Sequence, residues 1–256
     1  MLLKFPAQLD YLPKRIVSLV PSQTELLFHL GLDECVVGIT KFCIHPMAWK
    51  KSKTIIGGTK TIQQEKVKAL RPDLIIANKE ENVKEQVEEL AKEFTVLVTD
   101  VNNLESALQM IQTVGTITQT ELKAAQLADQ IEKRFAGILT LPKKITTCYL
   151  IWRKPYMTVG GDTFIHDMLI RCGLQNIYAP AKRYPEINLN QLQEANTQLL
   201  ILSSEPYPFK QKHIDKLQSQ LPGTKIILAN GEMFSWFGSR LLYAPAYFNT
   251  IISQLI

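Results

Sequence analysis

The chain has 256 residues, of which 46% are hydrophobic and 21% are charged. This composition fits a globular protein and excludes a disordered or fibrous one. The length accommodates one large domain or two lobes of roughly 100 residues each. The net charge of +5 is spread along the chain without a block of basic residues, which argues against a nucleic-acid partner.

Cysteine usage and the N-terminus bear on the cellular compartment. The four cysteines are widely spaced and form no CxxC pair, so a disulfide framework is not expected. The first ten residues lack the apolar core and cleavage site of a secretory signal. No apolar run approaches the roughly 18 residues that cross a bilayer. Taken alone, the sequence predicts a soluble, cytoplasmic protein.

The first half alternates short apolar runs with helical patterns. Residues 15–20 form a β-branched run, and Ser22 is then expected to cap a helix over 23–30, with Glu25 completing a capping box. Further strands are expected at 36–39, 54–56, 74–77 and 96–98, with helices between most of them, such as 82–93. Short continuous apolar strands that alternate with helices predict a parallel sheet covered on both faces.

Two consecutive helices are expected in the middle of the chain. The first covers 104–115, and residues 118–121 read as a capping box that starts the second. The second helix is expected to end at Pro142, and about 20 residues would span roughly 30 Å as a stiff connection. Its buried stripe is expected to consist of Leu122, Ala125, Ala128, Ile131, Phe135 and Ile138.

The second half repeats the pattern of the first. Strands are expected at 147–151, 199–202 and 225–228, and helices at 163–172, 210–220 and from 239 onward. Residues 191–202 repeat the helix-to-strand pattern of residues 65–76, which favours a duplicated lobe. The predicted fold is therefore α/β, with two Rossmann-like lobes of parallel strands joined by a single long α-helix and a ligand cleft between the lobes. The corresponding segments are 1–102, 103–142 and 143–256.

Motifs of catalysis and cofactor binding are missing. Residues 57–60 lack the spacing of a phosphate loop, and residues 160–163 are read as a tight turn capped by Asp162 or Thr163 in preference to an anion site. No Gly-x-Ser-x-Gly elbow or histidine metal motif occurs. Cys43 and His45 offer only two metal ligands. The sequence therefore predicts no enzyme, no metal site and no resident cofactor.

Aromatic residues gather at strand ends and in loops. In an open α/β sheet, the loops after the carboxyl ends of the strands form the ligand crevice. Aromatic rings in such loops bury a large flat ligand at low entropic cost, although several of them could instead pack between lobes. The residues concerned are Phe42, Trp152, Tyr156, Tyr184, Tyr207, Phe209, Phe234, Trp236 and Phe237.

The order of these motifs resembles a known family. The runs 15–26, 37–46 and 70–75, followed by 160–163, 171–174 and 235–237, resemble the helical-backbone substrate-binding proteins of cobalamin and iron–siderophore importers. The resemblance extends from about Arg15 to the C-terminus. It implies a solute-binding protein that captures a corrinoid or a ferric-siderophore-type chelate for an ABC importer, as a monomer in the periplasm.

The resemblance also implies binding residues. Stacking aromatics correspond to Phe42, Tyr184 and Trp236. Thr59, Asn78 and Met157 occupy further ligand positions, where the cobalamin binders often carry aromatics. The candidate ligand-binding set also contains Cys43, His45, Tyr156, Phe237 and Arg240. If the ligand is a corrinoid, Cys43 or His45 is expected to approach its metal face.

Family members dock their permease with one acidic residue from each lobe. Glu65 matches the first acidic position, whereas the second falls on Asn190, with Glu186 and Glu194 displaced from it. Together with the missing leader, this departure keeps open an alternative, a cytosolic protein that handles or senses corrinoids or metal chelates on the same scaffold. A metal-cluster enzyme is disfavoured because Cys43 is the only cysteine in an expected cleft loop.

Overall fold

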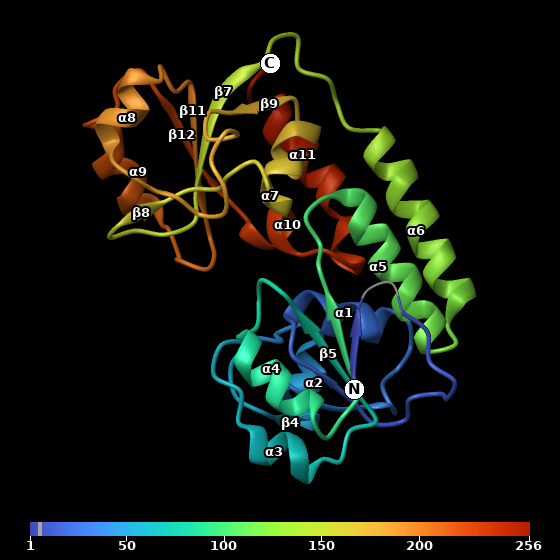
Figure 1. Ribbon diagram of the computed structural model, residues 1–256. Coiled ribbons are helices and arrows are strands. Elements are labelled where there is room, and N and C mark those ends of the chain that lie inside the picture. The colour runs from blue at the N-terminus through green and yellow to red at the C-terminus, as the bar shows by residue number, and fades with distance from the viewer. Residues whose placement is uncertain (5–6) are drawn as a thin grey trace. The chain divides into compact units, whose positions relative to one another are not determined.

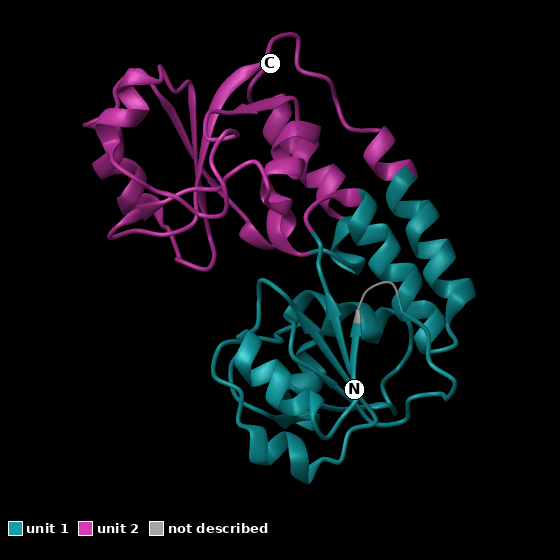
Figure 2. Ribbon diagram, in the orientation of Figure 1, with its two compact units in different colours: residues 1–101, 105–132, 237–242 teal, residues 102–104, 133–236, 243–256 magenta. Residues whose placement is uncertain are grey.

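The computed structural model describes residues 1–4 and 7–256, which form two compact units (Figure 2). Unit 1 comprises residues 1–101, 105–132 and 237–242, and unit 2 comprises 102–104, 133–236 and 243–256. Each unit is built on a parallel sheet with helices around it (Figure 1). The prediction of an α/β fold with two sheet-bearing lobes is confirmed. Nothing in the sequence pattern indicated that residues 237–242 belong with the first unit.

Unit 1 contains a six-stranded parallel sheet in the order β1-β6-β5-β2-β3-β4. Successive strands run outward from β2 to β4, and the chain then returns to place β5 on the other side of β2. The pair β2 and β5 is therefore the topological switch point of this sheet. Its strands are β1 (Leu2–Lys4), β2 (Ile16–Ser18), β3 (Val36–Ile39), β4 (Thr54–Ile55), β5 (Leu74–Asn78) and β6 (Val96–Thr99). Its helices are α1 (Pro21–His29), α2 (Met47–Ser52), α3 (Gln64–Ala69), α4 (Lys84–Ala91) and the 3₁₀ turn η1 (Ser239–Leu242).

Unit 2 contains a four-stranded parallel sheet in the order β12-β11-β7-β9, and a separate antiparallel pair, β10-β8. Here β7 and β11 form the switch point, in the same relation as β2 and β5. Its strands are β7 (Ile145–Leu150), β8 (Tyr156–Met157), β9 (Leu174–Asn176), β10 (Glu186–Ile187), β11 (Leu199–Ser203) and β12 (Lys225–Ala229). Its helices are α7 (Phe164–Arg171), α8 (Leu189–Glu194), α9 (Gln211–Gln218), α10 (Gly231–Ser235) and α11 (Ala244–Ser253).

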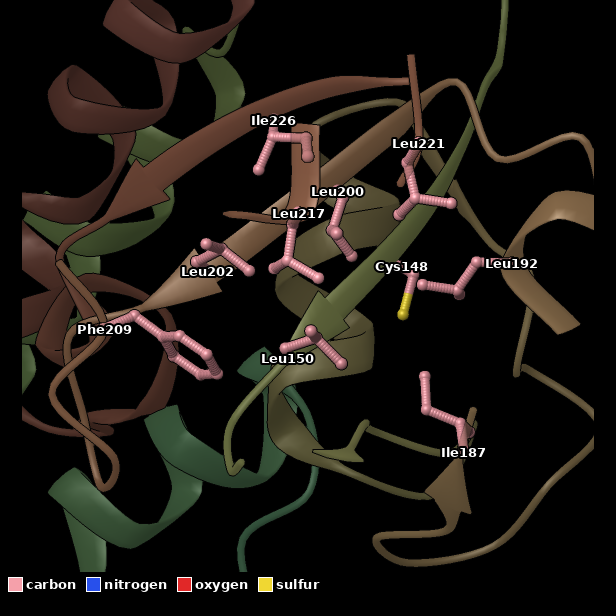
Figure 3. Close-up of a cluster of buried hydrophobic side chains, with 10 residues drawn as sticks. All are labelled: Cys148, Leu150, Ile187, Leu192, Leu200, Leu202, Phe209, Leu217, Leu221 and Ile226. Atoms are coloured by element: carbon pink, nitrogen blue, oxygen red, sulfur yellow. The ribbon is translucent and has the colours of Figure 1, made fainter. Parts of the chain in front are cut away.

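The core of unit 2 explains why its strands read as continuous apolar runs. Alternate side chains of a strand point to opposite faces of the sheet. On one face, Cys148 and Leu200 pack with Leu192 of α8 and Leu217 of α9 (Figure 3). On the other face, the ring of Tyr149 lies 5.2 Å from that of Phe234 in α10. Because helices cover both faces, both sets of side chains must be apolar.

The helix-to-strand repeat is visible in the backbone. In both units the central strand follows a short helix, α3 before β5 and α8 before β11. Each helix ends in a left-handed residue three positions before the strand, Arg71 with φ 44° and Asn196 with φ 47°. A left-handed residue directly after the last helical turn is a common way to end a helix. The two halves therefore share the same turn as well as the same order of elements.

Glycine at the first of these turns is expected to stabilise the protein. An L-residue in the left-handed region costs about 1–2 kcal/mol, and the greater freedom of glycine in the unfolded chain offsets part of that gain. Arg71→Gly should thus raise the free energy of unfolding by about 0.5 kcal/mol. Lys66→Gly, within α3, should lower it by about 1 kcal/mol. Urea unfolding measures both changes, and a loss of stability in Arg71→Gly would contradict the expectation.

The middle of the chain forms two helices, α5 (Leu104–Ile117) and α6 (Glu121–Ala136). They run side by side (Figure 1), and a Cβ at Gly115 would lie 2.4 Å from the Cβ of Ala124. The close approach of the two helices at Gly115 determines which face of α6 is buried. The buried residues are Ala124, Leu127, Ala128, Ile131 and Phe135.

The predicted stripe of α6 was therefore wrong at its start. Leu122 is 74% exposed and Ala125 is also exposed, whereas the prediction was right from Ala128 to Phe135. The helix is also shorter than expected, because it ends at Ala136 before Gly137. At 1.5 Å per residue its 16 residues span about 24 Å.

The predicted cap of the first helix was also wrong. Helix α1 starts at Pro21, and Val20 occupies the N-cap position without a side-chain hydrogen bond. Proline is favoured at the first helical position because it needs no hydrogen-bond partner for a backbone N–H there. Ser22 therefore lies inside the helix, and Glu25 is left for another role.

Candidate functional site

The carboxyl edge of the unit 1 sheet is organised by asparagine side chains at the switch point. Asn82, after β5, donates from Nδ2 to the carbonyl of Thr59 at 3.0 Å and to that of Leu19 at 3.3 Å. Its Oδ1 accepts the N–H of Asn78 at 2.9 Å. Asn78 in turn donates to Thr99. The loops after β2, β4 and β5 are thereby tied together.

Two of the implied ligand residues take part in this network. Asn78 is 1% exposed and Thr59 is 8% exposed. The Oδ1 atom of Asn78 accepts the N–H groups of Glu80 and Glu81 at 2.9 and 3.2 Å. In the structure these two residues hold loops in place, and a ligand-contact role for them stays a prediction.

The loop after β3 presents apolar side chains to solvent. Phe42 is 51% exposed and Ile44 is 37% exposed, and Met47, the first residue of α2, is 70% exposed. Lys41 Nζ lies 5.1 Å from the centre of the Phe42 ring, and the ring edge packs close to Gly58. One side of Phe42 is thus held by these contacts, while about half of the residue remains accessible to solvent. His45 lies in the same loop and is half-buried.

Cys43 differs from its neighbours in this loop because it is fully buried. Its Sγ lies 3.1 Å from Thr24 Oγ1 and 3.2 Å from Thr40 Oγ1. Burial raises the pKa of the thiol, so the neutral form prevails. The structure therefore shows Cys43 fixing the loop to α1.

Thiol labelling should reveal this burial. Of the four cysteines, only Cys35 is partly exposed, so we expect Ellman's reagent to label Cys35 alone in the native protein. Burial raises the pKa of Cys35 as well, and its labelling should accelerate between pH 7 and pH 9. Cys43, Cys148 and Cys172 should react only after unfolding. Two fast thiols in the native state would contradict this expectation.

The segment 237–242 packs on α1 through Gly238 and η1, and it contains Phe237 and Arg240. Phe237 is 5% exposed. The guanidinium of Arg240 donates to Glu25 through Nε at 3.0 Å and Nη2 at 2.6 Å. Glu25 is therefore an ion-pair partner rather than a helix cap, and Arg240 is engaged within unit 1. Glu65, the implied docking residue, lies on α3 with its side chain 90% exposed.

In unit 2 the structure brings three of the implied ligand residues together. Strand β8 carries Tyr156 and Met157, and it pairs with β10, whose first residue, Glu186, follows Tyr184 and Pro185 in the chain. Met157 also bridges to Trp152 across the turn after β7. Trp152, Tyr156 and Met157 therefore lie in the segment that follows the carboxyl end of β7, and Tyr184 lies just before β10, the partner strand of β8. Arg183 stacks on Tyr184, with 5.8 Å from the guanidinium carbon to the ring centre.

Trp236, implied as a stacking residue, occupies a different environment. It is 7% exposed, and its Nε1 donates to Glu205 at 3.0 Å. Ser235 donates to the same carboxylate oxygen at 2.7 Å. This arrangement joins the end of α10 to the loop after β11.

The set implied by the resemblance left out residues at the switch point of unit 2, although Trp152 and Tyr207 are among the loop aromatics that the sequence predicts to line a ligand crevice. Trp152 is 40% exposed, and its ring lies edge to face against Tyr207 at 5.8 Å. Tyr207 N donates to the carbonyl of Ile151 at 3.2 Å, so the loops after β7 and β11 meet here. One signal in the sequence was available: Trp152 and Arg153 directly follow a predicted strand that ends at residue 151.

The glycine pair before α7 closes a turn, and its two amides are engaged by backbone carbonyls. Thr163 caps the helix by accepting the N–H of His166 at 3.3 Å. The amides of Gly160 and Gly161 already donate to carbonyls of Arg183 and Ala181. The predicted turn with a Thr163 cap is confirmed.

Within residues 1–4 and 7–256, no group of three or more His, Cys, Asp or Glu side chains could hold a metal ion. Among the described helices, none combines the length and apolar character needed to cross a bilayer.

Comparison with known proteins identifies relatives of the whole chain. The family model described as "Periplasmic binding protein" matches residues 16–227. A Vitamin B12-binding protein of Pectobacterium carotovorum subsp. carotovorum (strain PC1) is 26% identical over 258 residues, which cover 95% of this chain and 89% of the relative. One from Yersinia pestis (strain Pestoides F) is 25% identical over 255 residues, covering 95% and 86%.

Solved structures share the fold. The periplasmic Vitamin B12 binding protein BtuF of Vibrio cholerae superimposes with a TM-score of 0.77 at 21% identity, covering 94% of this chain and 97% of that one. The periplasmic heme-binding protein BhuT in complex with two hemes gives a TM-score of 0.81 at 20% identity, covering 94% and 98%.

Proposed function

This chain belongs to the periplasmic binding protein family, and we propose on that basis that it captures a bulky metal chelate for delivery to an ABC importer. The family is one of binding proteins, so we propose capture without chemical transformation. The names of its relatives support a chelate of the corrinoid or ferric type. We further propose that the chain works as a monomer in the periplasm.

The observation that carries this proposal is the exposure of aromatic rings at the carboxyl edges of both sheets. Phe42 is 51% exposed in unit 1, and Trp152 is 40% exposed in unit 2. By contrast, Trp49 and Phe234 are almost fully buried in the cores. Large rings that remain exposed at the ligand-binding edge of an α/β sheet favour a flat apolar guest.

Calorimetric titration tests the proposal with cyanocobalamin, cobinamide and ferric siderophores as probes. We expect saturable binding of at least one probe. Phe42→Ala and Tyr184→Ala should each weaken it about tenfold, the effect of one lost aromatic contact. Tyr243→Ala is the matched control, because Tyr243 is 55% exposed but lies at the start of α11. Absence of binding by every chelate would refute the proposal.

We propose that Glu65 contacts the permease. Its side chain is 90% exposed, and Lys68 Nζ lies 3.9 Å from its carboxylate, a surface pair of little energetic weight. Glu65→Lys should abolish productive docking and leave the affinity for the chelate unchanged. Fractionation of the native host tests the compartment, since a strictly cytosolic protein would contradict delivery while leaving chelate capture intact.

A further inference from the structure

A groove of about 550 Å³ opens on the surface of unit 2, beside strands β7 and β9. Lys144, the residue before β7, and Leu174, the first residue of β9, both line it. The groove therefore lies at the amino ends of these two parallel strands. Ligands of open α/β sheets bind beyond the carboxyl ends of the strands, so the groove is distinct from the site proposed for the chelate. Its volume is within the range of small-molecule sites.

Buried apolar side chains form the floor of the groove. Phe135, Leu141 and Leu174 line it and are at most 8% exposed. Leu141 packs beside Gly173, where a Cβ would lie 3.5 Å from the Cβ of Leu141. The ring of Phe135 packs edge to face on that of Phe248 in α11, with 6.3 Å between the ring centres. The floor is thus part of the packed core, and the fold fixes its shape.

One wall of the groove is held in place by an asparagine of α11. Asn249 Oδ1 accepts the N–H of Leu139 at 2.8 Å, and its Nδ2 donates to the carbonyl of Gly137 at 3.2 Å. These bonds fix the segment that follows α6. Leu139 is nevertheless 44% exposed, and Ile170 of α7, which also lines the groove, is 49% exposed. Two large aliphatic side chains thus remain in contact with water, and an apolar ligand that covered them would be stabilised by their burial.

The charged groups of the groove are cationic. Lys144 and Arg171 line it, and none of the described residues in its lining is acidic. Arg171 Nε donates to Asp167 Oδ2 at 2.8 Å, so this carboxylate offsets the charge of Arg171. Lys144 is exposed, and within the described part of the chain it makes no ion pair. A net positive charge beside apolar surface favours a ligand with an anionic head group.

The exposed apolar surface suits an alkyl chain. A stable protein interface buries about 1,200–2,000 Å², whereas Leu139 and Ile170 are the exposed apolar side chains of the described lining. The contact area therefore favours a small molecule over a protein partner. Aromatic stacking is disfavoured, because the ring of Phe135 is buried and lies 6.0 Å from the guanidinium carbon of Arg171. Aliphatic side chains form the rest of the apolar lining.

We propose that this groove binds a free fatty acid of medium chain length. The alkyl chain lies over the buried floor and against Leu139 and Ile170, and the carboxylate pairs with Lys144. This second ligand differs in chemistry from the chelate, and its binding does not depend on the proposed function.

Calorimetric titration with octanoate, decanoate and dodecanoate, each below its micelle concentration, tests the contribution of the chain. Each methylene that becomes buried should tighten binding about fourfold, or about fifteenfold between successive probes. Dodecylammonium tests the head group, because it has a similar chain and the opposite charge. We expect it to bind about tenfold more weakly than dodecanoate.

Two variants assign binding to this groove. Lys144→Gln should weaken binding of dodecanoate about threefold to fivefold, the range of an exposed ion pair, and should not weaken binding of dodecylammonium. Ile170→Gln should weaken both probes about tenfold, because the chain loses an apolar contact. Each variant has a matched control at an exposed position outside the groove, Lys216→Gln on α9 and Leu122→Gln on α6. Both controls should bind the probes as the wild-type protein does.

The chain-length series and the variants can each overturn the inference. Absence of saturable binding by all three carboxylates would do so, as would affinities that do not rise with chain length. Equal affinities for dodecanoate and dodecylammonium would contradict the role of Lys144. If Lys144→Gln and Ile170→Gln bind dodecanoate as tightly as their controls, the fatty acid binds elsewhere and the inference is wrong.

Discussion

Replacement of Glu25 or Arg240 with alanine is expected to lower the free energy of unfolding by about 3 kcal/mol, since either change leaves a largely buried charge without its main partner. The two side chains make a bidentate pair at 2.6 and 3.0 Å and are 15% and 12% exposed. The remaining exposure places the loss at the low end of the range for buried pairs. Residue 240 belongs to the segment 237–242, which packs with α1 in unit 1, so the pair anchors that segment.

A double-mutant cycle measures the coupling directly. The double variant Glu25→Ala with Arg240→Ala should lose less than the sum of the single losses, with a coupling energy above about 1 kcal/mol. The control pair is Lys84 and Glu88 on α4, which lie 3.7 Å apart with 78% and 53% exposure. Its coupling should stay below about 0.5 kcal/mol. Urea unfolding measures the free energy of unfolding of each variant. If the losses of the two single variants simply add in the double variant, the pair contributes no more than a surface contact.

This ion pair could not be predicted from the sequence. The partners are 215 positions apart, and no local pattern connects them. The local sequence around Glu25 fits a capping box that starts at Ser22, and it therefore predicts a capping role for Glu25. Pro21 carried the competing signal, because proline is favoured at the first helical position, and the helix starts at Pro21, two residues earlier than predicted.

Elements with strong periodicity were predictable. Strand β5 and strand β11 are continuous apolar runs that lie between covering helices, and both were located from the sequence. Helix α6 was located too, yet its buried face was misassigned at Leu122. Two neighbouring stripes fit the apolar residues of its first turns nearly equally well, and the contact between Gly115 and Ala124 selects one of them.

The candidate binding residues also divide into those whose environment the sequence predicts and those whose environment depends on tertiary contacts. Phe42 and Tyr184 were predicted in strand-end loops, and the structure places Phe42 in the loop after β3 and Tyr184 two residues before β10. The burial of Cys43 and Trp236 depends on partners such as Thr24 and Glu205. Those contacts are tertiary, and no pattern among neighbouring residues in the sequence predicts them.

Asn82→Ala is expected to lower the free energy of unfolding by about 2–4 kcal/mol, because one side chain satisfies three buried backbone groups. Its loss would leave the N–H of Asn78 and the carbonyls of Leu19 and Thr59 without these bonds. Asn82 is 6% exposed, so water could not replace them without opening the loops. The loops after β2, β4 and β5 should loosen together, and amide hydrogen exchange at Asn78 should accelerate. Asn190→Ala, at an exposed position of α8, is the control and should stay within about 0.5 kcal/mol.

Asn82→Asp distinguishes lost hydrogen bonds from lost volume. The carboxylate would still accept from Asn78 N, but it would face the carbonyls of Leu19 and Thr59 without a proton to donate. Burial and these oxygens would raise the pKa of the new Asp above its unfolded value. The variant should therefore be less stable than wild type at pH 7 and recover part of the difference as the pH falls through that raised pKa. Equal losses at pH 7 and pH 5, measured by urea unfolding, would mean that the donors of Asn82 do not hold these loops.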